Sequence, residues 1–302
     1  MAERTRRAGG LGAIASTART LARTNPWRAG QALWRLNQEG GFNCPGCAWP
    51  EEAERRHIDW CENGVKHVAH EVTGRRIGAE FFAAWTIDKL LEQSDQWLES
   101  RGRLVEPLIR RRGSERYEPI SWDSALAHVA AALRALASPN EAVFYTSGRT
   151  SNEAAFLYQL LARQFGTNNL PDCSNMCHES SGTGLSQVIG IGKGTVGLDD
   201  FAKADAIFII GQNPRTNHPR MFSTLLAAKR RGCKIVSINA LKERSLVRFA
   251  HPQEVLRLFG EGTAISDLYL QLRIGGDVAL LKGIMKEGLA DEARAPGRGL
   301  DW

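Results

Sequence analysis

Hydrophobic residues recur at helical spacing in two stretches near the middle of the chain. The first begins at Ser121, a residue type that caps helices, and a strand-like apolar run follows at 142–146. The second begins at Ser151 and stops at Gly166, because glycine favours the left-handed conformation at helix ends. The pattern therefore predicts helix, strand and helix in this order.

Two further short apolar runs, 206–210 and 234–238, predict strands with a helix between them. Strands that alternate with helices indicate an α/β fold with a parallel sheet flanked by helices. Ligands of such sheets bind beyond the carboxyl ends of the strands. We therefore expect a ligand to meet residues 211–218 and the segment that begins at Asn239.

The residue composition and the hydrophobic pattern change along the chain and predict four parts. Residues 1–40 are rich in arginine and weakly patterned, so we interpret them as a basic arm that lies over the domain or is partly disordered. Residues 41–118, with clustered cysteines and tryptophans, predict a small domain organised around a metal centre. Residues 119–290 form the α/β domain, and 291–302 are expected to be an unstructured end.

Composition excludes several classes of protein. The apolar fraction of 43% and the charged fraction of 24% are ordinary for a folded domain. A net charge of +6 suits an anionic partner, and we favour a cofactor over nucleic acid because no known nucleic-acid-binding motif accompanies it. No run approaches the ~18 apolar residues that a membrane-spanning helix needs. Arg6 and Arg7 precede no sustained apolar stretch, so we expect a cytoplasmic protein without an export signal or membrane insertion.

The six cysteines are distributed as expected for metal or catalytic chemistry rather than for disulfides. Cys44, Cys47 and Cys61 lie within 18 residues, and the C-x2-C spacing lets two sulfurs face one metal atom or cluster. By itself the C-x2-C pair could bind zinc or an iron–sulfur cluster, form a redox pair or have no such role, and the nearby Cys61 favours a bound metal. No fourth ligand is obvious.

A second candidate centre is the segment NMCHESSG, which contains Cys177 followed by His178. A thiolate beside an imidazole supplies a soft metal ligand and a proton acceptor, which suits the removal of two electrons and a proton. A nucleophilic cysteine and an inert cysteine are the alternatives.

The segment GQNPRTNHP at 211–219 follows a predicted strand and opens a helix, so its backbone N–H groups are suited to meet a pyrophosphate. An ordinary strand-to-helix turn is the alternative. The glycine-rich segment at 190–195 does not fit the phosphate-loop pattern of nucleotide triphosphatases, and we reject that function.

Together these pieces resemble the molybdopterin oxidoreductase family, in particular its formate-dehydrogenase-like branch, which includes proteins implicated in acid resistance. The resemblance covers residues 41–288 through FNCPGCAW, CENGVK, EPISWDSAL, YTSGRTSNEAAFLYQLLARQFGTNN, NMCHESSG, IGIGKGTVGLDDFAKADAIFIIGQNPRTNHP and GGDVALLKGIM, in this order.

The resemblance implies a bis(molybdopterin guanine dinucleotide) molybdenum centre and a nearby [4Fe–4S] cluster. By this resemblance Cys177 ligates molybdenum and His178 accepts the proton, while Cys44, Cys47 and Cys61 are cluster ligands. The family's dinucleotide-binding segment falls on Gly211, Asn213, Pro214 and His218, and Asn239 follows the next strand.

Three positions depart from the family pattern. Glu51 stands where relatives carry a further cluster cysteine. Asn63 replaces a lysine thought to relay electrons to the pterin, with Lys66 nearby but offset. Asn239 stands where many relatives have an acidic residue. The chain is also less than half as long as typical members, so we interpret it as a truncated multidomain subunit, its N-terminal part.

The sequence thus predicts a molybdenum-dependent oxidoreductase that oxidises a small molecule, formate by analogy. Electrons would pass from the pterin to the [4Fe–4S] cluster and on to an unidentified acceptor protein. The alternative is a non-catalytic metal-binding or regulatory module derived from this family, which bound zinc without molybdenum would indicate.

Overall fold

The computed structural model describes residues 8–47, 49–51, 58–147, 150–171, 173–254, 260–297 and 299. The chain divides into two compact units, a first unit of residues 1–72 and 196–302 and a second unit of residues 73–195. The boundaries expected at residues 40, 118 and 290 do not coincide with this division. The reason is that the N-terminal segment packs with the C-terminal part of the chain, as the pairing of the strands β1 and β8 shows.

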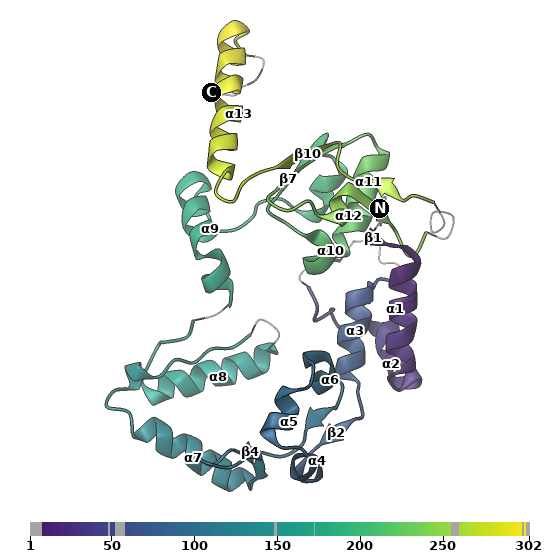
Figure 1. Ribbon diagram of the computed structural model, residues 1–302. Coiled ribbons are helices and arrows are strands. Elements are labelled where there is room, and N and C mark those ends of the chain that lie inside the picture. Colours follow the sequence, from purple (N-terminus) through teal and green to yellow (C-terminus); the bar gives the residue numbers. More distant parts are fainter. Residues whose placement is uncertain are drawn as a thin grey trace. The chain divides into compact units, whose positions relative to one another are not determined.

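The first unit contains two three-stranded sheets and the helices around them (Figure 1). Its strands are β1 (Ala8–Gly9), β6 (Ala206–Ile210), β7 (Lys234–Asn239), β8 (Arg248–Ala250), β9 (Thr263–Ala264) and β10 (Leu268–Gln271). Its helices are α1 (Gly10–Ala22), α2 (Pro26–Arg35), α3 (Glu62–Glu71), η2 (Leu198–Ala202), α10 (Pro214–Asn217), α11 (Met221–Arg230), α12 (Arg244–Val247) and α13 (Asp277–Arg294).

The larger hydrophobic core lies between the parallel sheet β10–β7–β6 and helix α11. Strand β7 pairs in parallel with β6 on one side and with β10 on the other. Ile235 of β7 and Phe222 and Leu225 of α11 are fully buried in this core. The two strands predicted for this region and the helix between them are confirmed, whereas β10 was not predicted.

The N-terminal segment is more ordered than the sequence indicated. Strand β1 pairs in parallel with β8, with Ala8 opposite Phe249. Helices α1 and α2 pack against α3, and Leu33, Leu36, Val65 and Val68 form a second small core there. At the other end of the chain, α13 continues to Arg294, past residue 291, where the sequence predicted that regular structure ends.

The second unit contains short strands and longer helices. Its strands are β2 (Arg76–Ile77), β3 (Arg103–Leu104), β4 (Leu108–Ile109) and β5 (Glu118–Pro119). Its helices are α4 (Ala79–Ala84), α5 (Ile87–Leu91), α6 (Asp95–Glu99), α7 (Trp122–Arg134), η1 (Pro139–Glu141), α8 (Asn152–Phe165) and α9 (Cys173–Ile189).

The predicted helix boundaries of α7 and α8 are confirmed. The Ser121 hydroxyl accepts a hydrogen bond from the Ser124 N–H at 3.2 Å, and Gly166 ends α8 with a φ of 107°. The predicted strand at 142–146 is wrong, because within that run only Thr146 has a bridge partner. Phe144 instead donates its N–H to the carbonyl of Asn169.

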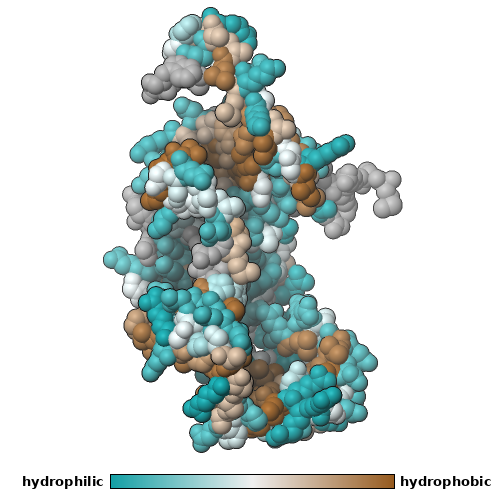
Figure 2. Space-filling view, turned by 90° about the vertical axis from the view of Figure 1, so that its left-hand side faces the viewer, coloured by the Kyte–Doolittle hydropathy of each residue, from teal (hydrophilic) through white to brown (hydrophobic). Residues whose placement is uncertain are grey.

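Several apolar side chains of α7 and α8 remain at the surface. Val129 is 58% exposed and Leu157 is 64% exposed. The space-filling view likewise shows brown apolar side chains at the surface (Figure 2). Among the described residues, no helix is long and apolar enough to cross a membrane.

Candidate functional site

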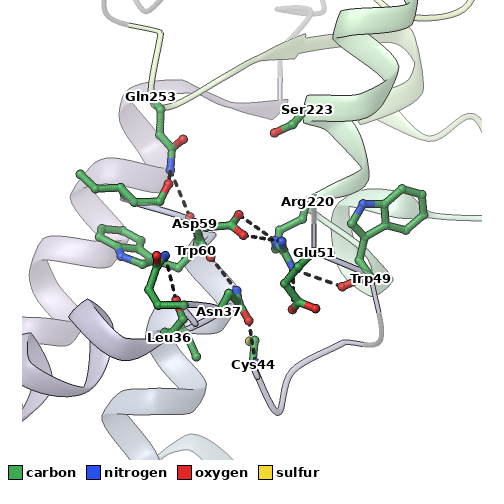
Figure 3. Close-up of polar contacts among 12 residues, drawn as sticks. Leu36, Asn37, Cys44, Trp49, Glu51, Asp59, Trp60, Arg220, Ser223 and Gln253 are labelled. Carbon is green, nitrogen blue, oxygen red and sulfur yellow. Dashed lines mark hydrogen bonds and ion pairs between the residues drawn. The ribbon is translucent and has the colours of Figure 1, made fainter. Parts of the chain in front are cut away.

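Asn37 holds together the two ends of the cysteine segment, which we define as residues 44–61. Its side-chain oxygen accepts a hydrogen bond from the Cys44 N–H at 2.8 Å, and its amide nitrogen donates to the carbonyl of Asp59 at 2.6 Å (Figure 3). Asn37 is fully buried and has a φ of 58°, a left-handed conformation that asparagine adopts more readily than most residues. This residue therefore links the backbone at Cys44 to the backbone at Asp59.

The sulfurs of Cys44 and Cys61 meet beside the first turn of α3. Cys61 is the N-cap of this helix, and its sulfur accepts the Gly64 N–H at 3.4 Å. A Cβ atom placed on Gly64 would lie 3.2 Å from the Cys44 sulfur and 3.9 Å from the Cys61 sulfur. Both thiols thus lie in space that the absence of a side chain at Gly64 leaves open.

Burial raises the pKa of the Cys44 and Cys61 thiols, and the negative charge of a neighbouring cysteine raises each further. Backbone N–H groups oppose this shift, as does Arg220 at Cys44. The thiols are therefore protonated at neutral pH, and a bound metal has to displace their protons.

The described cysteines are free thiols. In the described part of the chain, no three His, Cys, Asp or Glu side chains are grouped so that they could hold a metal ion.

Arg220 binds the cysteine segment at three places (Figure 3). Its guanidinium donates to both carboxylate oxygens of Asp59, at 3.0 and 2.6 Å, and to the Trp49 carbonyl at 3.1 Å. Its Nη1 atom also lies 3.5 Å from a carboxylate oxygen of Glu51. The Arg220 side chain is only 9% exposed, so these interactions are largely shielded from water.

The segment 211–218 occupies the position that the sequence predicted, after the carboxyl end of β6. Gly211 has a φ of 65° and donates its N–H to the carbonyl of Ile238, and the Asn239 amide lies 3.4 Å from the Gln212 carbonyl. The ends of the adjacent strands β6 and β7 are therefore joined, as expected for a ligand site at this edge of the sheet.

Within this segment, Asn213 and His218 have distinct environments. The side-chain oxygen of Asn213 is buried and accepts no hydrogen bond from any described group, and Pro214 beside it is also buried. Burial lowers the pKa of His218, whose Nδ1 lies 3.0 Å from the Gln212 amide nitrogen. A buried acceptor without a partner is rare in proteins, and it is suited to a ligand that donates a hydrogen bond.

The cysteine segment and the segment 211–218 lie against each other. The rings of Trp49 and His218 pack edge to face, with their centroids 6.2 Å apart. Just beyond the cysteine segment, the Asn63 amide of α3 donates to the Thr216 carbonyl at 3.3 Å. A cavity of about 550 Å³ adjoins both segments. Among the residues that line it are Cys61, Asn63, Lys66, Arg215, Arg220 and His251.

Cys177 and His178 lie in the second unit, on helix α9, whereas the other predicted site residues lie in the first. Both side chains are exposed. An exposed thiol and imidazole on one helix are accessible to a ligand from outside the unit.

Three residues that shape the site were not recognised in the sequence, namely Asn37, Asp59 and Arg220. Asn37 falls in the segment interpreted as a basic arm, and Arg220 is 161 residues from Asp59. No local pattern marks a pair so far apart. The Asn213-Pro214 dipeptide and Gly211, in contrast, were visible as turn signals.

Comparison with protein families gives a match to the molybdopterin oxidoreductase family over residues 103–293. The chain belongs to this family. The matched region contains most of the second unit and much of the first, including β6, β7 and the segment 211–218.

Individual molybdopterin oxidoreductases and related proteins are similar over different lengths. An uncharacterized oxidoreductase of Mycobacterium tuberculosis is 52% identical over 303 residues, which cover 100% of this chain and 39% of that protein. Protein YdeP of Escherichia coli is 48% identical over 96% of this chain and 39% of its own length. Formate dehydrogenase H of Escherichia coli is 32% identical over 65% of this chain and 26% of its own length. The chain thus spans about two fifths of its more similar curated relatives.

Proposed function

We propose that this chain provides the iron–sulfur and first cofactor-binding portions of a molybdenum-dependent oxidoreductase related to formate dehydrogenase. The observation that carries the proposal is the contact between the cysteine segment and the segment 211–218, which the rings of Trp49 and His218 make. Two neighbouring hydrogen bonds support it, one from Asn63 of α3 to the Thr216 carbonyl and one from Arg220 to the Trp49 carbonyl. Electron transfer between a cluster and a pterin requires that their binding segments lie close together. The bound cofactors supply the redox chemistry itself.

Cys44, Cys47 and Cys61 are the residues that would hold a [4Fe–4S] cluster. The absence of a side chain at Gly64 leaves room for the sulfurs of Cys44 and Cys61 on one side of α3, and three thiolates are the donor type that such a cluster takes. In such a cluster each thiolate binds a different iron, so the sulfurs need not gather around one atom. The thiols lose their protons as they bind, and the Arg220 guanidinium offsets part of the negative charge that results.

Gly211, Asn213, Pro214 and His218, with Asn239 on the next strand, are the residues that would hold one guanine dinucleotide of a bis(molybdopterin guanine dinucleotide) cofactor. The unpartnered Asn213 oxygen supports this assignment, because guanine carries N–H donors. Lys66 and Arg215 line the adjoining cavity and would meet anionic groups of the cofactor.

Cys177 would ligate molybdenum and His178 would accept the proton released from the substrate. Their exposure on α9 supports this role, since both side chains are accessible. Formate is the proposed substrate by analogy with the formate dehydrogenases among the relatives. An electron-acceptor protein would complete the reaction.

The metal content of anaerobically purified protein tests the proposal, measured by elemental analysis together with a visible absorption spectrum. Iron and molybdenum in the same preparation would support the oxidoreductase and justify an assay of formate oxidation. Zinc alone would contradict it and would favour a non-catalytic metal-binding module.

Replacement of the proposed molybdenum ligand, Cys177→Ser, should abolish turnover in the protein that carries both metals. The iron–sulfur absorbance should persist, because Cys177 is not among the three cysteines assigned to the cluster. Glu179→Gln changes an exposed neighbour on the same helix and is the matched control. Turnover that survives in Cys177→Ser would contradict the assignment.

A further inference from the structure

Glu51 stands four residues after Cys47, at the position where the family pattern has a further cluster cysteine. Its carboxylate is 19% exposed and lies 3.5 Å from Nη1 of Arg220. That guanidinium is itself fixed by two hydrogen bonds to Asp59 and one to the Trp49 carbonyl. Glu51 is therefore held at a cation whose position other residues determine.

The charge of Arg220 opposes coordination of Glu51 to iron. The arginine guanidinium carries a positive charge and presents five donors, so it holds a neighbouring carboxylate by charge and by hydrogen bonding. A carboxylate that moves to iron has to give up this ion pair in a mostly buried environment, which is costly. Iron–sulfur clusters are held by thiolates. Coordination of iron by a harder carboxylate oxygen therefore offsets less of this cost than coordination by a thiolate would.

We infer that the cysteine segment binds its cluster through three thiolates only, while Arg220 retains Glu51 outside the coordination sphere. This inference rests on the proposed iron–sulfur function. One iron of the [4Fe–4S] cluster then takes its fourth ligand from solvent or from a small molecule. Cys44, Cys47 and Cys61 bind the other three irons.

An iron without a protein ligand is released on mild oxidation. Ferricyanide removes one electron from the [4Fe–4S]²⁺ cluster and becomes ferrocyanide. The resulting [4Fe–4S]³⁺ cluster loses Fe²⁺ and leaves [3Fe–4S]⁺, which has a characteristic EPR signal. Iron loss and this signal therefore report on the fourth ligand without any assay of enzyme activity.

The experiment compares the full chain, purified anaerobically, with the variants Glu51→Gln, Glu51→Cys and Arg220→Gln. Iron per chain and EPR spectra are measured before and after one equivalent of ferricyanide. Glu254→Gln is the matched control, because it removes a carboxylate from the ion pair with Arg230 on α11 and leaves Arg220 unchanged.

We expect the wild type, Glu51→Gln and Glu254→Gln to lose iron alike and to show the same three-iron signal. Glu51→Cys should retain its iron, because a thiolate needs no release from Arg220. Arg220→Gln should lose less iron than the wild type, since its Glu51 is free to bind. A Glu51→Gln spectrum that differs from those of the wild type and Glu254→Gln would overturn the inference, because it would make Glu51 a ligand. Chains that bind no iron would overturn both the inference and the proposed iron–sulfur function.

Discussion

Gly64 has no side chain, and this leaves room for the sulfurs of Cys44 and Cys61 beside the first turn of α3. Gly64 is buried in α3, between the Cys44 and Cys61 sulfurs. Glycine lowers helix stability relative to alanine by roughly 0.5–1 kcal/mol, so its use inside a short helix is unfavourable on propensity alone. Space for the sulfurs is the physical reason for glycine at this position.

Replacement of Gly64 by valine should lower the iron content severalfold. The new side chain would begin 3.2 Å from the Cys44 sulfur and displace it from the site. Iron per chain after anaerobic reconstitution is the measurement. Gly30→Val in α2 is the control, because a Cβ atom at Gly30 would have nothing within 4 Å. It also places a β-branched residue inside a helix, as Gly64→Val does in α3. Equal loss of iron in both variants would show that crowding of the sulfurs is not the cause.

The sequence predicted the cysteines but not the residues that place them. Cys44, Cys47 and Cys61 stand out because they are a rare residue type in a short spacing. Asn37 and Arg220 belong to common polar types, and their roles depend on a left-handed backbone and on contacts over 161 residues. Whether the three cysteines and the segment 211–218 bind the expected cofactors stays a prediction.

At the scale of elements, β1 pairs the N-terminal part of the first unit with the strand β8 from its C-terminal part. It pairs with β8, and Gly9 approaches β8 so closely that a Cβ would meet the carbonyl oxygen of Ala250. Gly9 also has a φ of 77°, in the region that favours glycine. Helix α1 begins at the next residue, so β1 sets where α1 starts against α3.

Gly9→Ala should therefore lower the unfolding free energy of the first unit. The loss should exceed the cost of placing alanine at a positive φ, because the new Cβ would also clash with the Ala250 carbonyl oxygen. Gly40→Ala provides the comparison, since Gly40 has a φ of 68° but nothing within 4 Å of its Cβ position. A positive φ costs alanine on the order of 1–3 kcal/mol at either position, and only Gly9→Ala adds a steric clash. Urea unfolding monitored by tryptophan fluorescence gives the two free energies. Equal values would contradict a close approach of β1 to β8.

Elements with local signals were predictable, and elements that depend on distant partners were not. Ser121, Ser151 and Gly166 mark helix ends through side-chain or backbone chemistry that is present in the sequence itself. Strand β10 is recognisable only once β7 stands beside it. The run 142–146 has the composition of a strand but forms no ladder, so propensity was overridden there.

At the scale of the whole molecule, burial differs between the two units. The first unit has a continuous core beneath α11, whereas α7 has no buried residue among those described and α8 has only Ala162. Apolar helix faces that remain exposed are typical of surfaces that contact other protein. The α/β class was predictable from the alternation of elements, but this difference in burial was not.

Two leucine substitutions should differ in how much unfolding free energy they cost, because one leucine is buried and the other is exposed. Leu225→Ala in α11 removes a fully buried side chain and should cost about 2–5 kcal/mol in unfolding free energy. Leu157→Ala in α8 changes a side chain that is 64% exposed and should cost less than about 1 kcal/mol. Urea unfolding of each variant gives the comparison. A large loss from Leu157→Ala would mean that α8 is covered in solution.

The long separation between Asp59 and Arg220 also sets an order of events during synthesis of the chain. Asn37, Cys44 and Asp59 lie within 22 residues of one another, so the partners of the Asn37 hydrogen bonds leave the ribosome close together in time. Arg220 follows 161 residues later, which at ~5–20 residues per second is a delay of roughly ten to thirty seconds. During that interval Glu51 has no guanidinium to hold it. Metal delivered to the nascent chain therefore meets a different set of neighbours from metal delivered to the finished protein.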